Sequence, residues 1–313
     1  MNVHWLAATW HIGAITVTRV EEQLGNPNYP PGQYFTGFER GVLERHRSWL
    51  APNHYSLESD RLVTSVHSWL IRTPRHTILL DCCGGNHKHR PWLPRFHQQD
   101  RPFLASLQKA GAVPEDIDIV LCTHLHEDHS GWNTRLRDGV WVPTFPNAKY
   151  LFSKRENDYW DPAQHPGSEH PMRNVVYRDS VLPVIESGQA TLVEGDHAID
   201  DSLLVEPAPG HTPGHVLLKL SQGAQRAVFS GDIMHHVLQV YAPHWNSRFC
   251  ELPQAARATR KRVLEHCAEE RALLFPAHFG APFVAAIGAS ANGFEARLVC
   301  QSASTSTWPP RRP

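Results

Sequence analysis

The sequence predicts a layered α/β fold, in which helices cover the faces of a β-sheet. One indication is the order of an apolar strand, an amphipathic helix and a second apolar strand at residues 76–80, 100–111 and 117–122, an order typical of such folds. The other is that short apolar strands in both halves of the chain run into loops rich in His and Asp, and α/β scaffolds build their sites on such loops. No linker with a shift in composition divides the chain, so we expect residues 1–300 to form one domain.

The composition narrows the classes of function. The chain has 313 residues, 41% of them hydrophobic, and 30 Lys and Arg against 31 Asp and Glu give a net charge of -1. Such a balance provides no global field for recruiting nucleic acid or an anionic membrane. The first residues do not resemble a secretory signal, and no apolar run approaches the about 18 residues of a membrane span. The six scattered Cys resemble neither a disulfide scaffold nor a zinc knuckle. We therefore expect a soluble, cytoplasmic protein.

The N-terminal region begins with a strand at residues 12–20, where apolar and polar residues alternate. The pattern then stops, and residues 24–60 contain many turn formers and aromatic residues without clear periodicity. We interpret this segment as an irregular N-terminal arm. It is either a surface feature or a lid or dimer contact, because exposed aromatic side chains are costly to leave in water. A homodimer is therefore one of the expectations.

A hairpin at residues 62–71 and 76–80 comes next, and its second strand ends at Asp81. A carboxylate at that point either stabilises the turn or accepts a hydrogen bond from a metal-bound His. We expect residues 87–90 to form a solvated loop. The covering helix at 100–111 is predicted to start at Asp100, as its N-cap, and to stop at a glycine.

A cluster of metal-ligand residue types follows the apolar run 117–122. Residues 123–133 read THLHEDHSGWN, which places His124, His126, Asp128 and His129 within six positions. Imidazoles and a carboxylate at this spacing can converge at the end of a strand, and they would be unfavourable together without a cation. The motif therefore predicts a site for two metal ions.

In the second half of the chain, further ligand candidates each follow a short apolar strand. His211 comes after residues 203–205, Asp232 after 227–229 and His278 after 273–275. His215 begins the strand at 216–220, so we interpret it as structural. The other expected elements are a strand at 148–152, helices at 154–160 and 252–267, a solvated basic stretch at 257–262, a loop at 161–171 that borders a pocket, and a disordered tail at 301–313.

Taken together, these motifs resemble those of the metallo-β-lactamase superfamily. The resemblance covers roughly residues 63–282 and implies a four-layer αββα sandwich with a dinuclear metal site at one edge of two facing sheets. It also implies that His124, His126 and His211 hold the first metal, that Asp128, His129 and His278 hold the second, and that Asp232 bridges them. The carboxylate at Asp232 is unusual for true β-lactamases, which argues against antibiotic hydrolysis.

One departure from the lactonases concerns the substrate. Lactonases that open acyl-homoserine lactones carry a Tyr three residues after the bridging Asp, where this chain has His235. Together with residues 145–148 (FPNA), this arrangement is similar to the methyl parathion hydrolase branch. His235 and its neighbour His236 are candidates for substrate contact or for support of the metal ligands.

These residues predict a hydrolase that uses a metal-bound hydroxide on carboxylic esters or lactones, with organophosphate triesters as the alternative substrate class. Zn²⁺ suits the mixed His and carboxylate ligands best, and Fe, Mn or Co also fit. Asp128 is the candidate for passing a proton to the leaving group. Two further hypotheses are an iron-dependent redox enzyme of the same fold and a catalytically silent metal-binding protein. The only partner expected besides a second copy is a small-molecule ester, lactone or phosphotriester.

Overall fold

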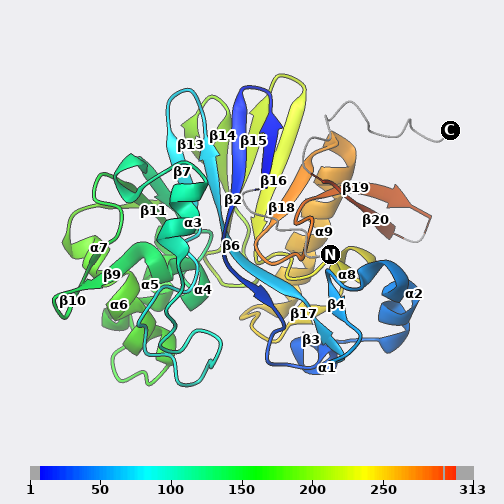
Figure 1. Cartoon of the computed structure of the whole chain (residues 1–313), viewed down its shortest axis with the longest axis horizontal. Helices are drawn as coiled ribbons and strands as arrows, with labels where there is room; N and C mark the ends of the chain where they lie inside the picture. Colours follow the sequence, from blue (N-terminus) through cyan, green and yellow to red (C-terminus); the bar gives the residue numbers. More distant parts are fainter. Residues whose placement is uncertain (1–7, 292, 301–313) are drawn as a thin grey trace.

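The computed structural model describes residues 8–291 and 293–300, so the tail expected at 301–313 lies outside the described residues. Two large sheets stand side by side at the centre, with helices on their outer sides (Figure 1). One apolar core contains buried side chains from both sheets, and two further cores join each sheet to its own helices. The arrangement is therefore the four-layer αββα sandwich that the resemblance implied.

The first sheet contains seven strands. It is antiparallel up to the fourth strand, and the last four strands run parallel to one another. Because parallel strands end at the same edge of a sheet, the loops that follow them lie together. In order across the sheet, the strands are β1 (Thr9–Ile12), β2 (Ile15–Gly25), β6 (Thr64–Arg72), β7 (Thr77–Leu80), β8 (Ile119–Leu121), β11 (Lys149–Ser153) and β12 (Ala190–Val193).

The second sheet also contains seven strands and is antiparallel except where β16 and β18 pair in parallel. Since two antiparallel pairings separate β14 from β16, these two strands share a direction and end at the same edge as β18. In order, the strands are β13 (His197–Asp200), β14 (Leu203–Pro207), β15 (Val216–Gln222), β16 (Gln225–Gly231), β18 (Leu273–Pro276), β19 (Ala285–Ser290) and β20 (Gly293–Leu298).

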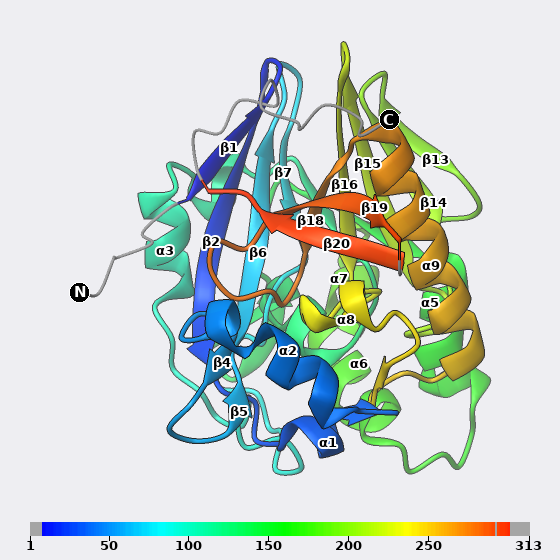
Figure 2. The ribbon, with the colours of Figure 1, turned by 90° about the vertical axis from the view of Figure 1, so that its right-hand side faces the viewer.

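Helices cover the outer face of each sheet (Figures 1 and 2). Against the first sheet pack α3 (Phe103–Lys109), α5 (Lys154–Trp160), η4 (Met172–Val176), α6 (Tyr177–Ser180) and α7 (Leu182–Glu186). Against the second pack α2 (Arg40–Leu50), α8 (Leu238–Tyr241) and α9 (Pro253–Glu270). The short elements are α1 (Pro31–Tyr34), η1 (Pro114–Asp116), α4 (Glu127–Ser130), η2 (Gly131–Asn133), η3 (Pro162–Gln164) and the strand pairs β3 (Phe35–Thr36) with β17 (Asn246–Ser247), β4 (Tyr55–Ser56) with β5 (Arg61–Leu62), and β9 (Thr134–Arg137) with β10 (Val140–Pro143).

Several elements lie where the sequence predicted them, including the hairpin of β6 and β7, strand β8 and helix α5. Others differ. The opening strand expected at 12–20 is divided by a turn at Gly13, which has a φ of 59°, and β2 then runs on to Gly25. The covering helix begins after Pro102 rather than at Asp100. The segment 24–60 is not wholly irregular, because it contains the helix α2, whose Val42 and Leu43 are buried.

The expectation of a solvated loop at 87–90 was wrong for Lys88 and Arg90, whose side chains are buried, whereas His87 and His89 are exposed. Lys88 and Arg90 are both 0% exposed. Two terminal nitrogens of Arg90 donate to the two carboxylate oxygens of Asp179, each at 2.7 Å. The Lys88 ammonium lies 3.5 Å from the centroid of the Trp141 ring. The basic stretch 257–262 is a second exception, since Arg260 is buried and donates to the Ile233 carbonyl.

Two further features of the described residues concern disulfides and membrane-spanning helices. All six cysteines are free, so no disulfide supports the described fold. Within residues 8–291 and 293–300, no helix has both the length and the apolar character needed to cross a bilayer.

We expect Asp179→Asn to lower the free energy of unfolding by about 3 kcal/mol or more, because it removes the charge that pairs with two buried cations. Urea unfolding followed by circular dichroism measures this change. The matched control is Asp201→Asn, which breaks the exposed pair with Arg75 and should change stability by less than about 1 kcal/mol. Equal urea midpoints for the two variants would contradict this account of the pair.

Candidate metal centre

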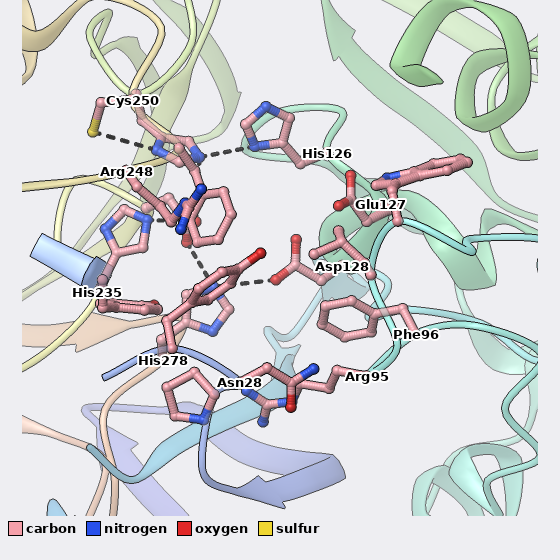
Figure 3. A pocket seen from close by; sticks show the side chains of 18 of the residues that line it. Asn28, Arg95, Phe96, His126, Glu127, Asp128, His235, Arg248, Cys250 and His278 are labelled. Carbon is pink, nitrogen blue, oxygen red and sulfur yellow. Dashed lines mark hydrogen bonds and ion pairs between the residues drawn. The ribbon is translucent and has the colours of Figure 1, made fainter. Parts of the chain in front are cut away.

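All seven predicted ligands come together at one edge of the sandwich, and both sheets contribute to them. His124, His126, Asp128 and His129 follow β8 of the first sheet, the last two on the single turn of α4. His211, Asp232 and His278 follow β14, β16 and β18 of the second sheet. Figure 3 shows the His126, Asp128 and His278 side chains converging from these different segments. The shared edge of the two sheets is what brings together residues that lie far apart in the chain.

Three histidines form the first group. The Nε2 atoms of His124 and His211 lie 3.1 and 2.9 Å from His126 Nδ1. Nitrogens bound at 2.0–2.1 Å around a tetrahedral zinc ion lie roughly 3.3 Å apart, so these three nitrogens are spaced as the ligands of one cation would be. The set is the one that the resemblance assigned to the first metal.

The second group consists of Asp128, His129 and His278. Its members approach one another less closely than those of the first group, with His129 Nε2 3.7 Å from Asp128 Oδ1 and His278 Nε2 3.5 Å from Asp128 Oδ2. All three donor atoms lie within 4.8 Å of one another, which leaves space for a cation between them.

Asp232 stands between the two groups, and each of its oxygens faces a different one. Oδ1 lies 3.2 Å from His129 Nε2 and 3.0 Å from His278 Nε2. Oδ2 lies 3.3 Å from His211 Nε2 and 4.0 Å from His124 Nε2. A carboxylate placed in this way can contact two cations at once.

The donor atoms fit a pair of divalent cations. Asp232 Oδ1 and His129 Nε2 are buried and make no hydrogen bond of acceptable geometry within the described part of the chain, although a buried polar atom needs a partner. Imidazole nitrogens and carboxylate oxygens are the ligands that zinc and related cations take. A cation in the second group would satisfy both orphaned atoms, and Asp232 Oδ2 faces the nitrogens that would hold a cation in the first group.

Burial determines the charge of the first group. It lowers the pKa of His126 to about 4 and the pKa values of His124 and His211 well below their ordinary value. These imidazoles are therefore neutral at physiological pH, which is the state that binds a metal. Burial also lowers the pKa of His129, but the charges of Asp232, Asp81 and Asp128 outweigh it and raise the pKa.

The outer nitrogens of the histidines are held by neighbouring groups. His129 Nδ1 lies 2.9 Å from Asp81 Oδ2, and His278 Nδ1 donates to the Ser65 carbonyl at 2.8 Å. Asp81 therefore has the supporting contact that its place at the end of β7 suggested. It also accepts hydrogen bonds from the Thr123 amide and hydroxyl, so one carboxylate orients both the loop and its histidine.

His215 is structural, as its place at the start of a strand indicated. Its Nε2 accepts a hydrogen bond from the Asp232 amide at 3.1 Å. Gly231 precedes Asp232 with a φ of 49°, and a Cβ there would lie 2.7 Å from His215 Nε2. This turn therefore requires glycine, and it directs the Asp232 carboxylate between the two groups.

The two candidates beyond the ligand set have different surroundings. His235 Nε2 lies 3.1 Å from Asp232 Oδ2 and 3.0 Å from the Ser247 hydroxyl, and the residue lines the cavity above the site. His236 instead donates to the His54 carbonyl at 2.8 Å and is not among the residues that line the cavity. Only His235 is therefore placed for a direct role in the site.

A cavity of about 540 Å³ opens over the two groups, a size that suits a small organic molecule. Asp128 and His278 of the second group line it, and so do His170 and Pro171 of the predicted bordering loop. Burial and the neighbouring Asp128 raise the pKa of Glu127, which also lines the cavity, to about 7.

Sequence reasoning missed most of the cavity wall. The segment 24–60 contributes Asn28, Tyr29 and Tyr34, and the loop after β7 contributes Arg95. The concentration of aromatic residues in 24–60 was the one available signal. Arg95 stands in a Pro-rich loop with no periodicity and gave no signal. Further wall residues are Trp92, Phe96, Met172, Phe249 and Cys250.

Known proteins resemble this chain in sequence. Residues 61–278 match the model of the metallo-beta-lactamase superfamily. An N-acyl homoserine lactonase from Bacillus sp is 27% identical over 193 residues, which cover 59% of this chain and 65% of that enzyme, slightly less than two thirds of its length. An N-acyl homoserine lactonase from Bacillus cereus is 25% identical over 78% of this chain and 92% of its own.

Solved structures show the same fold at low sequence identity. A structure described as hydrolase AbOPH in the beta lactamase superfamily has a TM-score of 0.78 and 22% identity, covering 94% of this chain and 97% of its own. AidC, described as a dizinc quorum-quenching lactonase in complex with a product, has a TM-score of 0.72 and 21% identity, covering 94% and 98%.

We expect Asp81→Asn to weaken zinc binding roughly 10- to 100-fold, because the single amide oxygen cannot accept from the Thr123 amide, the Thr123 hydroxyl and His129 together. Competition with a chromophoric chelator measures the affinity. The matched control is Asp118→Asn, at the opposite end of β8, where the carboxylate accepts from the Thr77 amide. Wild-type zinc affinity in Asp81→Asn would show that the contact does not support the site.

Proposed function

Because this chain belongs to the metallo-beta-lactamase superfamily, we propose that it is a metal-dependent hydrolase that opens lactone rings, with N-acyl homoserine lactones as the first substrates to test. The observation that carries the proposal is the Asp232 carboxylate, whose two oxygens each face one group of donor atoms. The lactonases among its relatives support the choice of substrate. Carboxylic esters share the same reacting bond and belong to the same proposal.

The residues that would hold the cations follow from the two groups. His124, His126 and His211 would hold one ion, and Asp128, His129 and His278 the other, with Asp232 between them. We propose Zn²⁺, which takes mixed imidazole and carboxylate ligands. When bound, two such ions would polarise the lactone carbonyl and lower the pKa of a water molecule from about 15.7 toward 7.

The chain's own residues have separable tasks in this reaction. Asp128 lines the cavity with its side chain 19% exposed, so its carboxylate can reach a bound substrate. It would take the proton of the attacking water and pass it to the ring oxygen as the acyl carbon–oxygen bond breaks. His235 holds Asp232 through its Nε2 atom, which keeps that carboxylate oriented, and it faces the substrate from the cavity wall.

The cavity wall would hold the rest of the substrate. Apolar and aromatic side chains such as Trp92, Phe96 and Met172 line it, and they would pack against an acyl chain and exclude water from it. The reacting end would then lie at Asp128 and His278, which line the cavity beside Asp232.

The decisive experiment combines metal analysis with a substrate screen. We expect about two zinc ions per chain and hydrolysis of homoserine lactones, measured by pH-stat titration, that is lost on chelation and restored by added zinc. p-Nitrophenyl esters and paraoxon-type triesters should react more slowly in the same screen. Iron in the site together with no hydrolysis of any of these substrates would overturn the proposal and favour a redox enzyme.

We also expect Asp128→Asn to lower kcat for a lactone roughly 10²- to 10⁴-fold, as the loss of a general acid–base group does. Metal content per chain, measured on the same samples, separates lost chemistry from lost metal. Asp158→Asn is the matched control, since this carboxylate pairs with Lys154 on the exposed side of α5. Full turnover by Asp128→Asn would remove Asp128 from the mechanism.

A further inference from the structure

Arg95 is a charged side chain in the cavity wall without an ion pair. Its three hydrogen bonds all go to neutral acceptors: Nε to Gln23 Oε1 at 3.1 Å, Nη1 to the Thr64 hydroxyl at 2.8 Å and Nη2 to the Thr64 carbonyl at 3.2 Å. No carboxylate of the described residues lies within ion-pair distance of it. Each terminal nitrogen therefore retains an N–H group available to a ligand.

The position of this guanidinium is fixed by the sheet. Gln23 lies on β2 and Thr64 on β6, two strands that pair through much of their length. An arginine tied to both strands loses little freedom when it binds a ligand, unlike an exposed arginine on a flexible stem. The arrangement is therefore that of a preorganised binding group.

One neighbour of Arg95 in the cavity wall can add a hydrogen bond to an anion. Asn28 lines the same wall, and its amide can donate a further hydrogen bond. Arg248, which stacks over Tyr29 with 4.2 Å to the ring centroid, also lines the cavity, but Figure 3 shows it beside Cys250, at the opposite end of the view from Arg95. The lining also contains Glu127 and Glu251, and Figure 3 shows Glu127 on the side of Asp128 away from Arg95. Burial lowers the pKa of Arg95, and Tyr34, Asp128 and Glu22 raise it in part from beyond ion-pair distance.

Arg95 lies apart from the reacting end of the cavity. In Figure 3 Arg95 and Asn28 occupy one end of the view, and Asp128 and His278 lie between them and His126. Trp92 and Phe96 line the wall near Arg95 in the chain, so an apolar spacer has a surface to pack against. A ligand that fills the cavity would thus have its reacting group at Asp128 and a different group at Arg95.

We propose that Arg95 forms an anion-binding subsite that selects lactones whose acyl chain ends in a carboxylate. This inference rests on the proposed lactonase function. A guanidinium and a carboxylate form charge-assisted hydrogen bonds, which are about twice as strong as neutral ones. The unesterified end of a dicarboxylic monoamide would meet Arg95, while its amide-linked homoserine lactone ring would reach Asp128.

The first test measures binding without turnover. The probes are the γ-lactam analogues of N-adipoyl and N-hexanoyl homoserine lactone, which match in chain length and differ in the terminal carboxylate. Calorimetric titration of the zinc-loaded protein should give a dissociation constant roughly 10- to 100-fold lower for the adipoyl lactam, the range of a hydrogen bond to a charged group. Equal affinities would overturn the inference.

The second test assigns the effect to Arg95. Arg95→Met should remove the preference for the adipoyl compounds in both binding and kcat/KM, so that the adipoyl and hexanoyl compounds give nearly equal values within this variant. Arg95→Lys keeps the charge and should retain part of the preference. The control Arg101→Met alters an exposed arginine of the neighbouring cavity and should retain all of it. A preference that persists in Arg95→Met would assign it to another residue.

The two proposals fail in different ways. If the wild type binds the adipoyl lactam more tightly through Arg95 but opens neither lactone, the proposed function is overturned and the subsite stands. If both lactones are opened at equal rates and both lactams bind equally, the function stands and the subsite is overturned. Because the comparison of probes on the wild type needs no variant, the inference remains testable even if Arg95→Met does not fold.

Discussion

The arrangement of the donor atoms at the shared edge of the two sheets depends on one constraint, the burial of polar groups around Asp232. Histidines from five separate positions approach this carboxylate within 4.0 Å, and all of them are buried. Such a concentration of titratable groups is unfavourable away from water unless each atom has a partner. Asp81 and the Ser65 carbonyl supply partners on the outer side of His129 and His278, and the Ser247 hydroxyl contacts the Nε2 atom of His235 that also faces Asp232. The unsatisfied inner atoms, Asp232 Oδ1 and His129 Nε2, mark where a cation would complete the network.

Two further buried carboxylates hold the loops that carry the site. Glu22 accepts hydrogen bonds from the amides of Gly84 and Gly85 and from the Trp132 indole. Glu156 accepts from the Leu125 amide in the first loop and from the Thr212 hydroxyl and the Gly214 amide in the second half of the chain. Burial raises the pKa of both carboxyl groups and these donors lower it in part. The loops are therefore positioned by protein groups alone, which is how a binding site is organised before its ligand arrives.

Features that depend on residues near one another in the chain could be predicted from the sequence. Features that depend on partners far away in the chain could not. The seven ligand candidates were recognisable because each lies in a loop just after a short apolar strand, and α5 and α9 because their patterns are helical. The layering into two sheets came from the resemblance, since no local pattern says which strands face one another. Lys88 and Arg90 read as solvated because Asp179, the carboxylate that allows their burial, lies about 90 positions along the chain. Arg95 escaped notice for the same reason, because Gln23 and Thr64 are brought to it only by the pairing of β2 and β6.

The division of the ligands between the two sheets has a consequence for the stability of the fold. Each group of donor atoms takes members from the loop after β8 and from loops of the second sheet, and within the second group His129 and His278 are far apart in the sequence. An ion held by such a set is a cross-link that closes a long stretch of chain, comparable to a disulfide between its two ends, and it forms only when both sheets are in place. With metal bound, this edge would hold the two sheets of the sandwich together. The six cysteines are free and form no disulfide. Bound metal would therefore be a reversible cross-link, and the free energy of unfolding would rise with the concentration of available metal.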